Sequence, residues 1–211
     1  MIEDMMTIAL AKGRLAKNAI KLMDMCGIDT SALKEDSRKL IMYDHKNNIR
    51  FILVKPTDVP VYVHRGVADI GVAGKDTLLE AGLPLYEMLD LRFGACKVCV
   101  AGYADVVCGQ EITKVATKYP RIAKMFYDQR GEDIEIIKLN GSIELAPILG
   151  LSDVIVDIVE SGDTIRENGL SVLEDICDVS ARLVVNQVSL KTKQEQIKDY
   201  IGKMKGALEN A

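Results

Sequence analysis

The chain of 211 residues has no hydrophobic run long enough to cross a membrane. Its amino terminus also lacks the features of a secreted protein, because Glu3 and Asp4 stand where a signal peptide would be basic. No repeat, low-complexity segment or serine- and proline-rich linker is present. From these absences we expect a cytoplasmic protein with no membrane partner.

Cysteine and histidine are too sparse for a disulfide framework or a metal site. The 5 cysteines are an odd number, and there are 2 histidines. Cys96 and Cys99 have the spacing of half a metal site, but no second pair follows. They also lie in KVCVAG, a strand-like segment in which residues three apart face opposite sides. We expect reduced, packed cysteines and no metal site formed by the protein. The five positions are Cys26, Cys96, Cys99, Cys108 and Cys177.

The remaining composition is that of a globular protein. It is 48% hydrophobic and 27% charged, which predicts a real core rather than disorder. The net charge of -4 argues against a nucleic-acid partner. It does not exclude an anionic ligand, because local clusters of lysine and arginine decide that.

Short apolar strands alternate with helical segments, which predicts an α/β fold of mostly parallel sheets flanked by helices. Strands are expected at residues 6–11, 49–54, 68–73, 85–89, 97–101, 114–117, 134–139, 154–159, 172–179 and 181–185. Helices are expected at residues 15–26, 58–65, 76–81, 120–129, 142–149 and 192–208.

The pattern restarts at Gly94, and the last strands are expected to return to the first half. We therefore expect two lobes, the first formed by residues 1–93 and 181–211 and the second by residues 94–180. A ligand is expected in the cleft between them, at the carboxyl ends of the strands.

The most informative stretch is DVIVDIVESGDTIRENG, residues 153–169. A β-branched strand leads into a glycine turn with hydroxyls and then into a helix, the geometry that binds phosphate. The two upstream carboxylates suit the hydroxyls of a ribose. The segment therefore predicts a ribose 5-phosphate site formed by Asp157, Glu160, Ser161, Gly162, Asp163 and Thr164.

The alternative interpretation of this segment is structural. A strand followed by an N-capped helix, with Ser161 or Asp163 as the cap, would give the same letters. The acidic Asp157 inside an apolar run favours the functional interpretation, because burying a carboxylate costs free energy unless the group has a partner or a role.

Three further strand-to-helix turns carry glycine with basic or hydroxyl side chains. Lys12, Gly13 and Arg14 follow the first strand, and two cations at a helix start oppose the helix dipole. A second basic pair, Arg38 and Lys39 in DSRKL, precedes a strand and alone is better explained as a solvated loop. The other two turns contain Gly74 and the pair Ser142 and Glu144.

In this order, the segments resemble the ATP phosphoribosyltransferase family, the first enzyme of histidine biosynthesis. The resemblance spans essentially the whole chain. It is carried by IALAKGRL, DVPVYVHRGVADIGVAGKD, DLRFGACKVCVAG, ATKYP, LNGSIELAPILGLSDVIVDIVESGDTIRENGL and SARLVVN. Ala11 stands where the family often has proline or serine, and Ser161 where threonine is common.

The resemblance implies a two-lobed fold like the periplasmic-binding-protein type II arrangement. It also implies the reaction, in which N1 of the ATP adenine displaces pyrophosphate from C1 of phosphoribosyl pyrophosphate (PRPP), with magnesium on the substrate phosphates. Arg14 and Arg38 would neutralise the leaving group, and the 157–164 segment would bind PRPP. ATP or pyrophosphate would be bound by Lys12, Gly13, Gly74, Ser142 and Glu144.

The chain length resembles that of the short form of the family, which works with a separate regulatory subunit resembling histidyl-tRNA synthetase. A homodimer within a hetero-oligomer is then expected, and histidine should not inhibit the chain alone. Two rival interpretations remain. One is a bilobal protein that binds or senses a small anion without catalysis, and the other is a nucleobase phosphoribosyltransferase.

Overall fold

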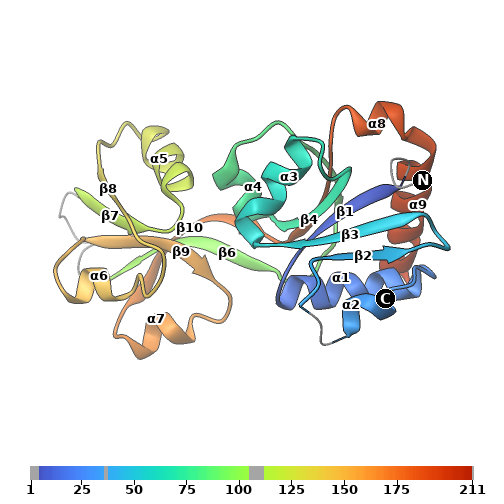
Figure 1. Cartoon of the computed structure of the whole chain (residues 1–211). Coiled ribbons are helices and arrows are strands. Elements are labelled where there is room, and N and C mark those ends of the chain that lie inside the picture. The colour runs from blue at the N-terminus through green and yellow to red at the C-terminus, as the bar shows by residue number, and fades with distance from the viewer. Residues whose placement is uncertain (1–4, 36–37, 105–111, 211) are drawn as a thin grey trace. The chain divides into compact units, whose positions relative to one another are not determined.

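The computed structural model describes residues 5–35, 38–104 and 112–210 (Figure 1). The chain divides into two compact units, one made of Met1–Gly94 and Ser180–Ala211 and the other of Ala95–Val179. It leaves the first unit after Gly94 and returns to it at Ser180. Within the described ranges, no helix combines the length and apolar character that a membrane span requires.

The first unit contains a six-stranded sheet in the order β2-β3-β1-β4-β11-β5. Strand β1 runs parallel to both β3 and β4, whereas β2, β11 and β5 pair antiparallel with their neighbours. The strands are Met6–Ala11 (β1), Ile41–Asp44 (β2), Ile49–Val54 (β3), Ile70–Gly74 (β4), Tyr86–Asp90 (β5) and Ala181–Val185 (β11).

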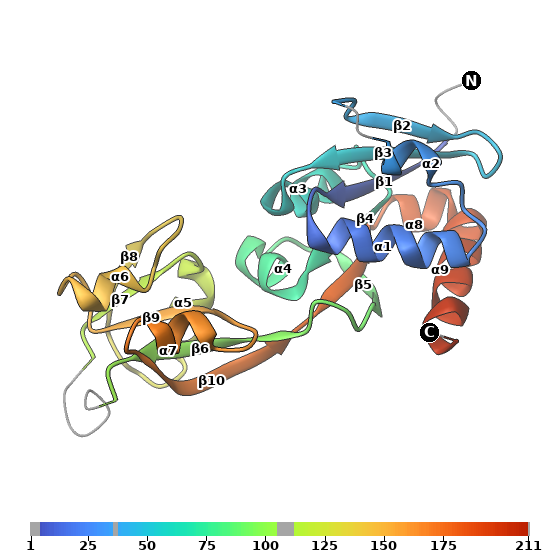
Figure 2. The same cartoon turned by 90° about the horizontal axis from the view of Figure 1, so that it is seen from below.

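Helices cover both faces of this sheet, and the alternation along β1 shows how. Ile8 and Leu10 pack with α1 and α9 on one face, while Ala9 and Ala11 pack with α3 and α4 on the other. Figure 2 shows α1 and α9 on the same side. The helices are Arg14–Met25 (α1), Ser31–Lys34 (α2), Val59–His64 (α3), Lys75–Ala81 (α4), Ser189–Thr192 (α8) and Gln194–Glu209 (α9), with a 3-10 turn at Pro56–Asp58.

The second unit contains a five-stranded sheet in the order β10-β6-β9-β7-β8. Ile155 of β9 lies in a core with Ile165 of α7 and Ala146 of α6, so these two helices cover one face. The elements are Cys96–Gly102 (β6), Lys114–Thr117 (β7), Pro120–Asp128 (α5), Glu135–Lys138 (β8), Leu145–Ile148 (α6), Val154–Val159 (β9), Asp163–Glu167 (α7) and Ser171–Val179 (β10).

The α/β class is confirmed, but the expectation of mostly parallel sheets is wrong. Both sheets are mixed, with parallel pairs β3-β1-β4 and β8-β7-β9 and antiparallel strands beside them. The short turn after Asp44 forces β2 and β3 to be antiparallel, because so few residues cannot make a crossover. The long strands β6 and β10 are the first and last strands of the second unit. They pair antiparallel, with Cys96 at the start of β6 opposite Val179 at the end of β10.

Candidate functional site

Polar turns from several strands gather at one edge of the first unit's sheet. Because β1, β3 and β4 are parallel, their carboxyl ends share this edge, with Ala11 opposite Val54. The antiparallel strands β2 and β11 bring their amino ends to it, since Ile41 pairs with Ile52 and Ala181 with Gly74. The segments that precede β2 and β11 and the segments that follow β1 and β4 therefore lie at the same edge of the sheet.

The basic turn Lys12-Gly13-Arg14 joins β1 to α1, and all three residues are exposed. Gly13 has φ 118° and ψ -155°, a conformation that side-chain-bearing residues rarely adopt. The first turn of α1 has no acidic residue, and its N-cap residue, Gly13, has no side chain that could accept hydrogen bonds from the helix. Arginine at the first helical position therefore opposes the helix dipole without local compensation from an acid in that turn.

Arg38 is exposed and lies in the segment that enters β2. The backbone N–H of Leu53 donates to the carbonyl of Leu40 at 2.9 Å, which fixes this segment beside the carboxyl end of β3. Arg38 thus belongs to the same sheet edge as Arg14. Asp36 and Ser37, which precede it in the DSRKL segment, lie outside the described residues.

The turn from β4 to α4 closes tightly over Gly74, which is buried. A Cβ atom at Gly74 would lie 2.2 Å from an oxygen of the Asp76 carboxylate, so no larger residue fits without moving Asp76. Lys75 forms an ion pair with Glu87, and its backbone N–H donates to the carbonyl of Ser180 at 2.9 Å. The turn is therefore tied to the point where the chain re-enters the first unit.

A polar network at the same edge was not predicted from the sequence. The Asp90 carboxylate accepts hydrogen bonds from the Ser180 hydroxyl at 2.7 Å and the Arg92 backbone N–H at 2.8 Å, and it pairs with Arg182 at 3.0 Å. Burial raises the pKa of Asp90, but these hydrogen bonds and the arginine charges outweigh it, and the net pKa is lowered. Asp90 and Ser180 are far apart in sequence, so no local pattern could reveal the contact.

The second unit has a comparable edge. Strands β7, β8 and β9 are parallel and in register, with Thr117 opposite both Lys138 and Val156. The segments that follow them therefore lie at one edge of this sheet. They include the turn with Ser142 and Glu144 and residues 160–164, and Asp157 lies in the last half of β9 itself.

Asp157 is not the buried carboxylate that the sequence predicts. Strand β7 ends in register with Val156, so the last residues of β9 pair only with β6, and they become partly exposed. The Asp157 carboxylate accepts a hydrogen bond from the Ile158 backbone N–H at 2.8 Å. The half-exposed position removes the burial argument for Asp157, yet it leaves the carboxylate at the open sheet edge.

The glycine turn after β9 also differs from the structural interpretation given above. Gly162 itself is the N-cap of α7, in the left-handed region at φ 76°, and neither Ser161 nor Asp163 holds that position. The Ser161 hydroxyl donates to the Asp163 carboxylate, and Asp163 also pairs with Arg166. These two partners lower the pKa of Asp163.

Arg166 is a second residue that sequence reasoning missed. Its guanidinium donates to the Ser161 carbonyl at 3.0 Å, in addition to the pair with Asp163. The spacing of Asp163 and Arg166, one turn apart on a short helix, was the available signal. Thr164 is exposed at the second position of α7.

The helix expected from residue 142 begins later. Helix α6 spans Leu145–Ile148, with Glu144 as its N-cap, because Ser142 has a positive φ of 48°. A serine in this region is strained, and such positions concentrate at functional sites. Ser142 is exposed at the carboxyl end of β8, so the strain holds a hydroxyl at the sheet edge.

The two edges differ in chemistry, and their described residues form no metal site. Cations dominate the first, while carboxylates and hydroxyls dominate the second. Across the described ranges, no three histidine, cysteine or acidic side chains are grouped so as to hold a metal ion. The described cysteines, Cys26, Cys96, Cys99 and Cys177, form no disulfide, and Cys108 lies outside the described residues.

The fold and these strand ends place the chain in the class of α/β proteins that bind small ligands at the carboxyl ends of parallel strands. Residues 55–206 match the family model described as "HisG: ATP phosphoribosyltransferase". The ATP phosphoribosyltransferase of Thermoanaerobacter sp. (strain X514) is 57% identical over 204 residues, covering 96% of each chain. The chain belongs to the ATP phosphoribosyltransferase family.

Two further comparisons cover nearly the whole chain. The ATP phosphoribosyltransferase of Lachnoclostridium phytofermentans is 55% identical over 210 residues, which is 97% of this chain and 98% of that one. A solved structure described as "ATP phosphoribosyl transferase (HisG:HisZ) complex from Thermotoga maritima" has a TM-score of 0.85 at 34% identity. That match covers 98% of this chain and 100% of the other.

Proposed function

We propose that the chain transfers the phosphoribosyl group of PRPP to N1 of ATP, giving phosphoribosyl-ATP and pyrophosphate, in the first step of histidine biosynthesis. The observation that supports this most strongly is 57% identity, over 96% of each chain, to a protein named for that activity. In this reaction the N1–C1 bond forms while the bond from C1 to the pyrophosphate oxygen breaks, and pyrophosphate leaves with the electron pair. Adenine N1 has a free lone pair, so no general base is needed.

The basic edge of the first unit suits the leaving group. Negative charge grows on pyrophosphate as the C1–O bond breaks, and preorganised cations stabilise that charge most in the transition state. We assign Arg14 and Arg38 to this role, with Lys12 and Gly13 helping to hold the anion. Gly74 is assigned to ATP or pyrophosphate through the backbone of its turn.

The edge of the second unit suits the sugar phosphate. Asp157 and Glu160 would accept hydrogen bonds from the ribose hydroxyls, and the 161–164 turn would bind the 5-phosphate. Asp163 would act chiefly through its backbone N–H, because its carboxylate is negative and would repel a phosphate. Ser142 and Glu144 are assigned to ATP or pyrophosphate.

Magnesium would enter on the substrates rather than as a resident ion. The donor set fits this, because Mg²⁺ is usually held by one or two carboxylates together with substrate phosphates and waters. Its chemistry would be to neutralise the phosphates, while the protein cations bind the departing group. A cytoplasmic location remains part of the proposal.

We also propose a regulatory partner. The Thermotoga maritima protein with the same fold was solved as a HisG:HisZ complex, which supports pairing with a HisZ-type subunit that resembles histidyl-tRNA synthetase. The chain would form a homodimer within that hetero-oligomer. Co-purification with such a subunit, followed by assay with and without histidine, tests the pairing. Strong inhibition of the chain alone by histidine would contradict it.

The activity is tested by mixing the protein with PRPP, ATP and magnesium, with and without a HisZ-type subunit. Formation of phosphoribosyl-ATP together with pyrophosphate is the expected result. Binding of PRPP without any product under both conditions would instead favour an anion-binding or sensing protein. Product formed from a free nucleobase, but not from ATP, would favour a nucleobase phosphoribosyltransferase.

A further inference from the structure

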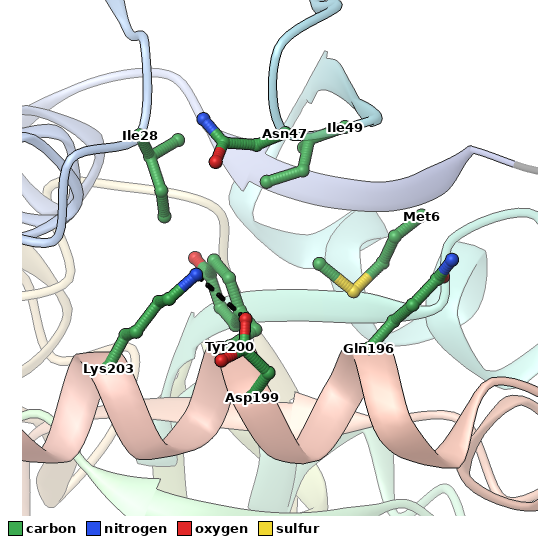
Figure 3. Close-up of a pocket in the computed structure, with 8 residues that line it drawn as sticks. All are labelled: Met6, Ile28, Asn47, Ile49, Gln196, Asp199, Tyr200 and Lys203. Atoms are coloured by element: carbon green, nitrogen blue, oxygen red, sulfur yellow. Dashed lines mark ion pairs between the residues drawn. The ribbon is translucent and has the colours of Figure 1, made fainter.

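A small cavity lies in the first unit, at the end of the sheet opposite to its basic edge. It has a volume of about 90 Å³ and is lined by the starts of β1 and β3, the turn before β3 and helix α9. Figure 3 shows side chains of α9 rising toward Ile28, Asn47 and Ile49. The full lining is Met6, Ile28, Asn47, Ile49, Gln196, Asp199, Tyr200 and Lys203.

Tyr200 is the most informative residue of this cavity. Its side chain is 2% exposed, and its hydroxyl is buried with no hydrogen-bond partner among the described residues. Burial raises the pKa of Tyr200, so the hydroxyl stays neutral and can donate. An unsatisfied buried hydroxyl destabilises a protein unless it gains a partner, and a ligand in the cavity would supply one.

The opposite wall of the cavity is fixed in advance. The Asn47 amide donates to the Asp44 carboxylate at 2.6 Å and to the Gly27 carbonyl at 3.4 Å. Asp44 is 1% exposed, and it also accepts from the Asp29 backbone N–H at 2.9 Å. The amide oxygen of Asn47 is thereby held in a set orientation, which reduces the ordering cost of binding a ligand.

The charges around the cavity indicate what kind of ligand fits. Asp199 and Lys203, one turn apart on α9, form an ion pair at 2.7 Å, and both line the cavity. A simple anion would meet the Asp199 carboxylate, and a simple cation would meet the Lys203 ammonium. A small molecule with both charges suits the pair, and the apolar side chains of Met6, Ile28 and Ile49 suit a short hydrocarbon group.

We propose that this cavity binds a small aliphatic α-amino acid. The ligand carboxylate accepts hydrogen bonds from the Tyr200 hydroxyl and the Lys203 ammonium group, and the ligand ammonium group faces Asp199. The aliphatic side chain packs against Met6, Ile28 and Ile49. This site lies at the opposite end of the sheet from Arg14, and the proposal does not depend on the transferase activity.

The test measures binding of L-alanine and L-valine to the whole chain by calorimetry and by the shift in thermal midpoint. Tyr200→Phe removes only the hydroxyl, and we expect it to weaken binding at least about 10-fold, because the lost hydrogen bond is to a charged group. Lys203→Met should weaken it by a similar factor. Both variants should fold, because one loses an unpartnered group and the other is exposed.

The chain offers a matched control in Tyr127. Its hydroxyl is also buried without a partner among the described residues, but Tyr127 is not among the residues that line the cavity. Tyr127→Phe should therefore leave amino-acid binding unchanged. The proposal fails if neither amino acid binds the parent protein, if Tyr200→Phe binds as well as the parent, or if propionate alone gives the same affinity as alanine.

Discussion

The two sheet edges are built alike but carry opposite chemistry. In each unit, parallel strands end in register and open into glycine-containing turns. The first edge presents Lys12, Arg14 and Arg38, whereas the second presents Asp157, Glu160 and the hydroxyls of the 161–164 turn. The difference shows that a few turn residues decide whether the same α/β arrangement presents cations or hydrogen-bond acceptors, which under the proposed function would serve the departing anion and the sugar.

The largest expected effect is on the basic edge. Arg14→Ala or Arg38→Ala should lower turnover by about 10²–10³-fold, on the scale of losing one preorganised donor to developing charge. Substrate affinity should fall much less, because the leaving-group charge grows only in the transition state. Single-turnover rates and equilibrium binding, measured on the same variants, separate the two effects.

Lys17→Ala is the matched control for this prediction. Lys17 is an exposed cation on the same helix, three residues after Arg14. Removing it changes the charge of α1 without touching the proposed site, so its rate should stay close to the parent's. A single-turnover rate in Arg14→Ala that matches Lys17→Ala would remove Arg14 from the leaving-group role.

The second prediction concerns the hydroxyl edge. Thr164→Ala should weaken PRPP binding by about 1.5–3 kcal/mol, because a hydrogen bond to a charged phosphate is lost. ATP binding should survive, since its proposed contacts lie in other turns. Calorimetry with each substrate checks this. Thr192→Ala, an exposed threonine on α8, should change neither affinity, and an unchanged PRPP affinity in Thr164→Ala would contradict the phosphate-turn assignment.

A third prediction separates the effect of backbone strain on stability from the effect of the 161–164 turn on PRPP binding. Gly162 and Gly169 have nearly the same positive φ, 76° and 73°. An alanine at either position should cost about 1–2 kcal/mol of stability, because side-chain-bearing residues disfavour this region. Only at Gly162 would the new Cβ approach another side chain, lying 3.0 Å from the Arg166 guanidinium.

Gly162→Ala should therefore lose PRPP affinity as well as stability, whereas Gly169→Ala should lose stability alone. Thermal unfolding and PRPP calorimetry on both variants give the comparison. Equal PRPP affinities would mean that the geometry of the 161–164 turn does not matter for binding.

Local sequence patterns predicted many of the elements. The bounds of β1, β3, β7 and β11 match the expected strands, since each is a short apolar run between turn residues. Gly27 and Gly82 end helices α1 and α4 with positive φ, as glycine after a helical run indicates. The turns at Lys12 and Gly162 likewise follow strands, as the sequence predicts.

What the sequence could not provide depends on contacts between distant residues. The prediction of mostly parallel strands was wrong because β11 pairs antiparallel with β4, and β6 with β9. These pairings depend on the path of the whole chain and not on local sequence. The exposure of Asp157 depends on where β7 stops. The Asp90 network and the buried hydroxyl of Tyr200 arise only when remote segments meet.

The smallest expected effect compares two aspartates, one at the basic edge and one remote from both edges. Asp90 lies at the basic edge of the first unit, and Asp153 lies just before β9, at the opposite end of the second unit's sheet. For both, burial raises the pKa, but hydrogen bonds and nearby cations outweigh it, so the pKa in the folded protein is lowered. Such a group stabilises the fold above its unfolded pKa, and this stabilisation is lost as pH falls through the folded pKa.

Asp90→Asn and Asp153→Asn should therefore each lower stability at neutral pH by up to about 1 kcal/mol, because the groups are solvent-screened. The deficit relative to the parent should begin to close as the pH falls below about 4, the ordinary pKa of an unfolded aspartate, and should vanish only below the lower pKa that each group has in the folded protein. Thermal midpoints across pH test this, and a deficit that persists in acid would show that charge is not its cause.

Only Asp90→Asn should also lower kcat/KM. Asp90 accepts a hydrogen bond from Ser180, whose carbonyl accepts one from the Lys75 backbone N–H beside Gly74. Equal loss of kcat/KM in both variants would mean that the network acts on the fold alone.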